Sequence, residues 1–263
     1  MSFVDDFLDW SHQGLLQSEE AQEYLRGRGI SADQWTRHRL GYTIGEFDVD
    51  PSKNPGHGTI CSDRDSSHAW CDSCRYRRWS SKWEIVEDGA PKQQFVGRRI
   101  LNHVVFPLTS YTGAAIGFQL RSLAEKSYDS FMVSRRPEGY FFGITSSISS
   151  IWSSKEAWLV EGPGDHLIIE RLVVPNVIGI TTSSPSIAQV RFLRRFVKRV
   201  VLCLDMDSAG RKGVRDFIQH HGSFFDSVVD VKYPCLGPKD KDPGDLWKKV
   251  GDSGFARRFR LAA

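Results

Sequence analysis

The sequence predicts an α/β protein in which a parallel sheet flanked by helices follows a smaller region of mixed helices and strands. The first observation is an alternation of short apolar runs with amphipathic segments from residue 155 onward, which is typical of parallel strands joined by helices. The second is that an acidic cluster follows three of these runs. We expect strands at about 157–161, 174–180, 199–205 and 227–233, and helices at about 164–172, 185–197, 209–221 and 243–250.

The composition sets broad limits on the kind of protein. A chain of 263 residues, 40% hydrophobic and 25% charged, forms one large or two small globular domains. It has neither an apolar run approaching a membrane span nor an N-terminal secretory signal, so we expect a cytoplasmic protein without a membrane partner. A net charge of only +3 means that nucleic-acid binding would depend on local basic patches.

The first 150 residues are expected to form the smaller region. Residues 1–40 have helix signals, including the N-cap residues Ser18 and Ser31. Residues 83–143 read as β-rich, with a hairpin-like pair around a turn at Tyr111. Thr145–Ser154 is rich in serine and is predicted to be a linker. The expected domains are therefore 1–150, a catalytic domain at 151–255, and a C-terminal tail at 256–263.

A cysteine and histidine cluster lies in the polar segment 44–82. Four residues have spacing suited to a tetrahedral zinc ion, with a CxxC half that turns tightly around the metal: His57, Cys61, Cys71 and Cys74. His68 is a rival for the fourth ligand position. Zinc would hold together a segment otherwise too polar to fold. The alternative is a solvated loop with free thiols.

A basic and aromatic stretch follows this segment. Arg75, Arg77 and Arg78 are interleaved with Tyr76 and Trp79. Guanidinium groups pair with phosphates and aromatic rings stack on bases, so the stretch suits a nucleic-acid strand. The alternative is a solvated face with one buried tryptophan.

The three acidic clusters are expected to converge, because sites in open α/β sheets form at the carboxyl ends of the strands. Asp205 and Asp207 are two residues apart, so both side chains would face the same side of a regular strand. Glu161, at the end of a neighbouring strand, would complete the cluster. Converging carboxylates are the usual ligands of a hard divalent cation.

These clusters resemble the toprim domain in order and spacing: Glu161-Gly-Pro-Gly-Asp165, Asp205-Met-Asp207-Ser-Ala-Gly210-Arg211 and Asp242-Pro-Gly-Asp245. The region upstream resembles the RNA polymerase domain of DnaG-type primases of bacteria and phages. This likeness rests on Tyr24-Leu-Arg-Gly-Arg-Gly-Ile30 followed by Leu40-Gly-Tyr42, on Ile116-Gly-Phe-Gln-Leu-Arg121, and on Gly139-Tyr-Phe-Phe-Gly143. Together the resemblance covers roughly residues 20–255.

The resemblance implies an enzyme that makes short RNA primers on single-stranded DNA from ribonucleoside triphosphates, by nucleotidyl transfer with two or more Mg²⁺ or Mn²⁺ ions. It makes Glu161, Asp205 and Asp207 catalytic and metal-binding, with Asp165, Asp242 and Asp245 as further metal ligands. Asp165 could instead be a helix N-terminal residue, and Asp242 a cap before Pro243. The residues expected to bind nucleotide or DNA are Arg121, Lys126, Arg135 and Arg136, each of which could also be an ordinary surface charge.

The sequence also departs from that family. DnaG-type primases usually carry a separate N-terminal zinc domain and a C-terminal helicase-related domain, whereas this chain has its Cys/His cluster inside the polymerase-type region. Gly244 stands where the common DPD form has its second Asp, which makes Asp245 a weaker candidate than Asp242. We therefore expect the partner to be a replicative helicase or a separate template-recognition protein, as in a compact phage primase.

Two other functions fit parts of the pattern. A toprim nuclease would use the same acidic residues, so only the primase-like segment 20–143 favours synthesis over cleavage. A non-catalytic DNA-binding module like RecR also joins a zinc motif to toprim, but the β-rich block at 95–143 argues against it.

Overall fold

The structure is a computed structural model. It describes residues 3–45, 47, 101–124, 127–132, 139–237 and 239–262. The chain forms two compact units. Unit 1 comprises Met1–Gln22, Arg39–Pro107 and Ala115–Arg136, and unit 2 comprises Glu23–His38, Leu108–Ala114 and Pro137–Ala263. Each unit thus combines segments that are distant in the sequence.

Unit 1 is built on a four-stranded sheet with the order β1-β2-β3-β4. The strands are β1 (Gly41–Tyr42), β2 (His103–Thr109), β3 (Ala115–Ser122) and β4 (Tyr128–Met132), and β2 and β3 are the strands expected on either side of the turn at Tyr111. Helix α1 (Phe3–Gln17) packs on this sheet, where Phe7 stacks on Phe118 with ring centroids 4.1 Å apart. Helix α2 (Glu19–Arg26) follows α1 and begins in this unit.

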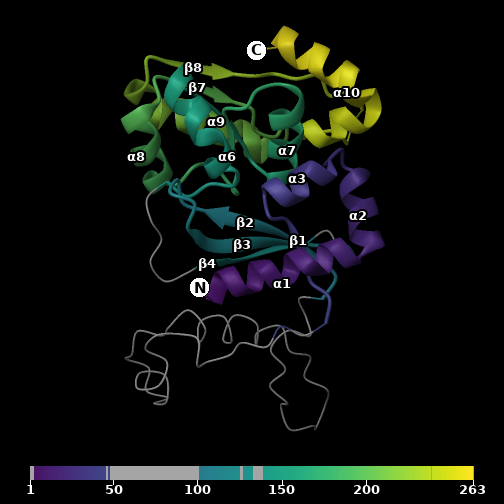
Figure 1. Cartoon of the computed structure of the whole chain (residues 1–263). Helices are drawn as coiled ribbons and strands as arrows, with labels where there is room; N and C mark the ends of the chain where they lie inside the picture. Colours follow the sequence, from purple (N-terminus) through teal and green to yellow (C-terminus); the bar gives the residue numbers. More distant parts are fainter. Residues whose placement is uncertain are drawn as a thin grey trace, which may run out of the picture. The chain divides into compact units, whose positions relative to one another are not determined.

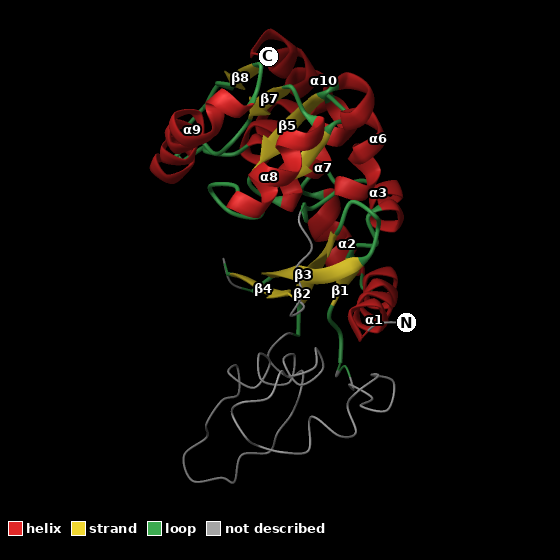
Figure 2. Cartoon of the chain, turned by 90° about the vertical axis from the view of Figure 1, so that its left-hand side faces the viewer, coloured by secondary structure: helices red, strands yellow, loops and turns green. Residues whose placement is uncertain are grey.

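Unit 2 contains a parallel sheet with the order β6-β5-β7-β8 (Figures 1 and 2). The strands are β5 (Glu156–Val160), β6 (Val177–Gly179), β7 (Arg199–Leu202) and β8 (Ser227–Asp230). Its helices, apart from the end of α2, are α3 (Ala32–Arg37), α6 (Ile144–Ser154), α7 (Pro163–Leu172), α8 (Ile187–Phe196), α9 (Ser208–His221) and α10 (Pro243–Ala262). The predicted alternation of strands and helices from residue 155 is confirmed.

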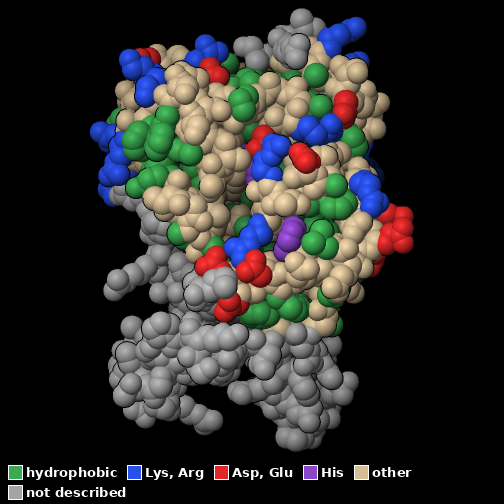
Figure 3. Space-filling model, viewed as in Figure 1, with side chains coloured by type: hydrophobic (Ala, Val, Ile, Leu, Met, Phe, Trp, Pro, Cys, Tyr) green, Lys and Arg blue, Asp and Glu red, His purple; other side chains and the backbone are tan. Residues whose placement is uncertain are grey.

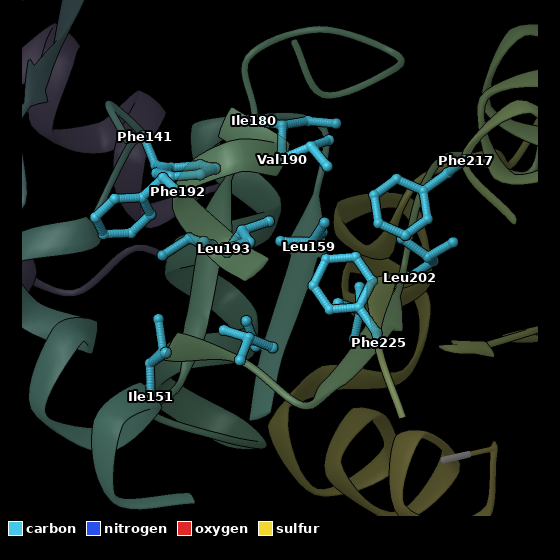
Figure 4. Packing of buried hydrophobic residues seen from close by; sticks show 14 of the residues in the cluster. Phe141, Ile151, Leu159, Ile180, Val190, Phe192, Leu193, Leu202, Phe217 and Phe225 are labelled. Carbon is cyan, nitrogen blue, oxygen red and sulfur yellow. The ribbon is translucent and has the colours of Figure 1, made fainter. Parts of the chain in front are cut away.

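Helices cover both faces of this sheet because successive strand residues point to opposite sides. On one face, Leu159 and Leu202 pack with residues of α6, α8 and α9, as Figure 4 shows for Phe192 and Phe217. On the other face, residues of β5 and β7 pack with residues of α7 and α10. The central strands β5 and β7 are therefore apolar and buried after their first residues, as in a doubly covered parallel sheet.

The prediction that the serine-rich segment Thr145–Ser154 is a linker is wrong, because these residues form helix α6. Ile144, Ile148 and Ile151 are buried on one side of it, at the spacing of a helical face. Serine lowers helix propensity only modestly, so this apolar face decides the structure.

The segment expected as a tail, residues 256–263, also has structure where it is described. Helix α10 extends to Ala262, with a break at Gly251, whose φ is +63°. Phe259 in its second half is fully buried against Tyr233. The domain boundaries at 150 and 255 remain predictions.

Across the described part of the chain, each helix is too short or too polar to span a membrane.

Candidate active site

Glu161 and Asp205 follow two neighbouring strands of the parallel sheet. Strand β5 pairs with β6 on one side and with β7 on the other, so the strand order reverses between β5 and β7. A crevice outside the carboxyl ends of the strands forms at such a reversal. The Asp205 backbone N–H donates to Glu161 Oε1 at 3.1 Å, which ties the two strand ends together. The predicted convergence of the first two clusters is present.

Asp207 lies at the start of helix α9 rather than in a strand. β7 ends at Leu202, so the expectation that Asp205 and Asp207 share one side of a regular strand is wrong. Asp207 is the N-cap of α9, and its Oδ1 accepts hydrogen bonds from the backbone N–H groups of Ala209 and Gly210, each at 3.0 Å. Its second oxygen, Oδ2, takes no part in this cap.

Lys241 joins these two aspartates. Its Nζ donates to Asp205 Oδ2 at 2.9 Å and to Asp207 Oδ2 at 3.1 Å. The Lys241 carbonyl accepts from the Met206 backbone N–H at 2.7 Å, so the loop around 241 is fastened to the loop after β7. Our sequence reasoning missed Lys241 as a site residue, although its position directly before Asp242 was a usable signal.

A buried tyrosine also holds the loop around Lys241 in place. The Tyr233 hydroxyl, 2% exposed as a residue, lies 3.2 Å from the Leu204 carbonyl and 2.7 Å from the Lys241 carbonyl. Both carbonyls are acceptors for this one hydroxyl, which holds the end of β7 close to the third acidic cluster.

The third cluster is partly structural. Asp242 Oδ1 accepts from the Asp245 backbone N–H at 2.7 Å, as expected of a cap at the start of α10. Asp245 Oδ2 accepts from the Lys241 backbone N–H at 3.2 Å. The Gly244 N–H donates to Asp165 Oδ1 at 3.3 Å, which links the third cluster to the first turn of α7. Residue 244 therefore contributes its backbone N–H to this link, and as a glycine it adds no carboxylate.

Burial and mutual repulsion raise the pKa of most of these carboxyl groups. Burial, followed by the charge of Asp205, raises the pKa of Glu161 to about 7. Burial is also the main cause that raises the pKa of Asp165, Asp205 and Asp242. By contrast, the Gly210 N–H and the Lys241 ammonium lower the pKa of Asp207. The cluster is thus short of positive charge, with Lys241 as the cation that contacts two of its members.

Carboxylates that are short of neutralising positive charge suit a divalent cation. In this site, however, the carboxylates are not close enough together to surround an ion by themselves. Among the described residues, three ligand atoms of His, Cys, Asp or Glu lie within 4.8 Å of one another only at His38, His166 and Glu170, none of which belongs to the three acidic clusters. An ion at the acidic site would accordingly take few carboxylates and complete its shell with water or phosphate oxygens, as Mg²⁺ commonly does.

Comparison with known proteins agrees with this arrangement. Residues 155–232 match the Toprim domain family. The fold of nearly the whole chain matches the "DnaG catalytic core", with a TM-score of 0.70 over 99% of this chain and 79% of that one, at 18% identity. The chain is similar to the DnaG-type primases in sequence and in fold. It also matches the zinc-binding and RNA polymerase domains of the Aquifex aeolicus primase, with a TM-score of 0.69 and 24% identity over 99% of this chain and 60% of that one.

Curated DNA primases are similar over almost the full length of the chain. The Aquifex aeolicus DNA primase is 25% identical over 97% of this chain and 47% of its own length. The Legionella pneumophila DNA primase is 22% identical over 92% of this chain and 39% of its own length. The chain thus spans less than half the length of these primases.

Of the other predicted residues, Arg121 belongs to unit 1 and the rest lie outside the described residues. Arg121 is in β3 of unit 1, 9% exposed, with its guanidinium 4.4 Å from the centroid of the Tyr128 ring. The predicted zinc ligands and the remaining basic candidates lie outside the described residues: His57, Cys61, His68, Cys71, Cys74, Arg75, Arg77, Arg78, Lys126, Arg135 and Arg136.

A basic surface is present on unit 2. Figure 3 shows Lys and Arg side chains gathered over α8, whose exposed residues include Arg191, Arg194 and Arg195. Such a surface suits a polyanion, although it also serves to solvate a helix.

Proposed function

We propose that this chain synthesises short RNA primers on single-stranded DNA, as a primase for DNA replication. The observation that carries the proposal is the extent of the likeness to primases: it spans unit 1 and unit 2, not the Toprim match alone. A toprim nuclease would share the acidic residues but gives no reason for a primase-type unit upstream. Synthesis therefore explains more of the chain than cleavage does.

The acidic residues have distinct roles in this proposal. Bound Mg²⁺ or Mn²⁺ ions would lower the pKa of the primer hydroxyl and neutralise the departing pyrophosphate. Asp205 and Asp207 Oδ2 would hold such an ion after Lys241 withdraws, because those are the oxygens that Lys241 now contacts. Glu161 lies beside Asp205 and would contribute a third oxygen donor.

Asp165, Asp242 and Asp245 are proposed as further metal or nucleotide contacts. Asp242 Oδ1 and Asp245 Oδ2 accept the hydrogen bonds that hold the loop and the start of α10. The Oδ2 atoms of Asp165 and Asp242 receive none of the hydrogen bonds described above. Asp242 thus combines its capping role with a place in the site.

Template and nucleotide would be bound by basic residues. Related catalytic domains have been solved bound to single-stranded DNA, and we infer the same ligand for this chain. Arg121, Lys126, Arg135 and Arg136 are proposed to contact nucleotide or DNA, and Arg75, Arg77 and Arg78 to contact the template. A replicative helicase or a template-recognition protein is the proposed partner, and the 44–82 segment the proposed zinc site.

The test is primer synthesis on random single-stranded DNA with labelled ribonucleotides and Mg²⁺ or Mn²⁺, with and without a candidate helicase. We expect short RNA from the wild type and at least a 100-fold loss in Asp205→Asn, because transition-state charge stabilisation of this kind is worth about 100-fold or more. Asp226→Asn, an exposed aspartate in the loop before β8, is the matched control and should retain activity.

Cleavage of the template without RNA synthesis, abolished by the same Asp205→Asn change, would instead assign the nuclease function. DNA binding that is unchanged in Glu161→Gln, with no metal-dependent product from the wild type, would assign a non-catalytic binding role.

A further inference from the structure

Two histidines and a glutamate converge in the interior of unit 2. His166 and Glu170 are four residues apart on α7, so they lie on the same face of that helix, and His38 comes from the C-terminal end of α3. One ligand atom from each of the three lies within 4.8 Å of the other two. Their side chains are 0%, 6% and 4% exposed for His166, Glu170 and His38, respectively.

The distances fit a small ion. His38 Nε2 lies 2.7 Å from Glu170 Oε2, and His166 Nε2 lies 3.9 Å from Glu170 Oε1. Ligand atoms of a tetrahedral zinc ion with bonds of about 2.0 Å are separated by roughly 3.3 Å. The observed separations lie on either side of this value, so small side-chain rotations would complete the geometry.

His166 is the observation that points to a ligand. It is fully buried, and neither its Nδ1 nor its Nε2 makes a hydrogen bond of good geometry. Such a buried polar group carries a desolvation penalty of about 1–3 kcal/mol unless something binds it. A metal ion between His166 and Glu170 would satisfy one ring nitrogen.

The surrounding residues hold His166 and Glu170 in place. Ser146 Oγ donates to Glu170 Oε1 at 2.8 Å, and Gln34 Nε2 donates to Glu170 Oε2 at 3.2 Å. The His166 ring lies against Gly143, where a Cβ atom would be only 2.1 Å from the ring Cε1. Hydrogen bonds of this kind to the carboxylate orient ligands around bound metals.

We propose that His38, His166 and Glu170 form a metal site, separate from the acidic cluster, that binds one zinc ion or a similar transition ion. Neutral imidazole nitrogens with a carboxylate oxygen are ligands that such ions accept and that Mg²⁺ does not favour. The ion would join the end of α3 to α7, the helix whose first turn carries Asp165. Its role would be to fix α7, so it does not depend on the proposed primase activity.

The test uses the full chain labelled with ¹⁵N in histidine. Long-range proton–nitrogen NMR spectra would be compared after chelation and after addition of one equivalent of zinc beyond any bound elsewhere. We expect one ring nitrogen of His38 and one of His166 to shift on zinc binding, with the signals assigned by their loss in His38→Gln and His166→Gln. Histidine signals that are the same in both conditions, in folded wild-type protein, would overturn the proposal.

Metal content provides a second measurement. Elemental analysis should find one equivalent less in Glu170→Gln than in the wild type, whatever the 44–82 segment binds, and no change in the exposed controls Glu23→Gln and His220→Gln. Equal metal content in folded Glu170→Gln and wild type would identify the three residues as a hydrogen-bonded group without metal. If Glu170→Gln fails to fold by circular dichroism, the wild-type NMR result decides.

Discussion

Lys241 supplies the positive charge that lets Asp205 and Asp207 lie close together without a divalent ion. Its ammonium contacts both carboxylates, and the hydrogen bond to Asp205 is the main cause that raises the pKa of Lys241. A metal ion and this ammonium would compete for the same oxygens. At the scale of single residues, the two aspartates can therefore be neutralised either by the Lys241 ammonium or by a bound metal ion.

The Lys241→Met substitution tests this competition. Without the ammonium, the two carboxylates repel each other, and we expect a loss of about 1 kcal/mol of stability in Mg²⁺-free buffer. Added Mg²⁺ should then raise the Tm by about 2–4 °C more in Lys241→Met than in the wild type. Thermal unfolding with and without Mg²⁺ measures both effects. Lys248→Met, an exposed change on α10, is the control, and an equal Mg²⁺ effect in all three proteins would contradict the idea.

Glu161 gives a prediction about pH. Its pKa in the folded protein is about 7, above the ordinary value of 4.5. Ionised Glu161 therefore destabilises the native state above pH 7, and this penalty disappears as the pH falls towards 4.5.

We expect Glu161→Gln to raise the free energy of unfolding at pH 8 by on the order of 1–2 kcal/mol, allowing for its partial exposure. The gain should vanish near pH 5. Urea unfolding in Mg²⁺-free buffer at both pH values measures it, with exposed Glu23→Gln as the control. A gain that is independent of pH would mean that the charge of Glu161 is not the cause.

Sequence patterns predicted the acidic side chains of the site but not their polar partners. Glu161, Asp205 and Asp207 follow recognisable apolar runs, so their meeting could be expected. The contact of Lys241 Nζ with Asp205 depends on how the loop before α10 folds back, to which Tyr233 contributes. His166 and His38 are 128 residues apart, a separation over which a single sequence gives no pairing signal.

At the scale of elements, helix α9 depends on a glycine at its first turn. A Cβ atom on Gly210 would lie 2.1 Å from the Asp205 carbonyl oxygen and 2.7 Å from Glu161 Oε1. Glycine therefore allows the start of α9 to approach the ends of β5 and β7. This close approach is what brings the Asp207 cap beside Asp205.

Gly210→Ala should move the start of α9 away from Asp205. We expect a loss of about 1–3 kcal/mol in the free energy of unfolding, of the size seen for overpacked sites, together with weaker Mg²⁺ binding. A Cβ atom on Gly222, at the other end of the same helix, would lie 3.9 Å from Ile218 Cγ2, so Gly222→Ala should be neutral within about 0.5 kcal/mol. Urea unfolding and Mg²⁺ titration provide the measurements, and equal effects of the two changes would disprove the role of Gly210.

Periodicity predicted the elements of unit 2 well, because a doubly covered parallel sheet imposes a strong apolar pattern on each strand. It failed at α6, where serine content concealed the buried face formed by Ile144, Ile148 and Ile151. Composition was a weaker guide there than the spacing of three isoleucines.

At the scale of the whole molecule, the predicted zinc site in segment 44–82 gives a prediction about metal content. Changing Cys71 and Cys74 together to Ser should remove one equivalent of zinc and reduce primer synthesis on long templates, because two of four ligands are lost. Cys235→Ser, at an exposed free cysteine of unit 2, should change neither quantity. Elemental analysis and the primer assay test this, and unchanged zinc content in the double variant would refute the site.

The overall fold class could be predicted from sequence, whereas the place of Glu23–His38 in unit 2 could not. The expected boundary followed the chain, but Glu23–His38 belongs with the residues after Pro137. Within unit 2, Gln34 Nε2 donates to the Leu167 carbonyl at 2.7 Å, and Gly29 lies against the Trp247 indole. Such long-range contacts are set by three-dimensional packing rather than by local propensity.

These contacts have a consequence for how the protein folds as it is synthesised. The segment around α3 leaves the ribosome early, yet Trp247, which packs on Gly29, is translated more than 200 residues later. The Lys241 and Asp242 loop is also synthesised late, so the three acidic clusters cannot come together before residues 241–245 have been translated. Because contacts between distant segments slow folding, unit 2 is expected to complete its structure only after helix α10 has left the ribosome.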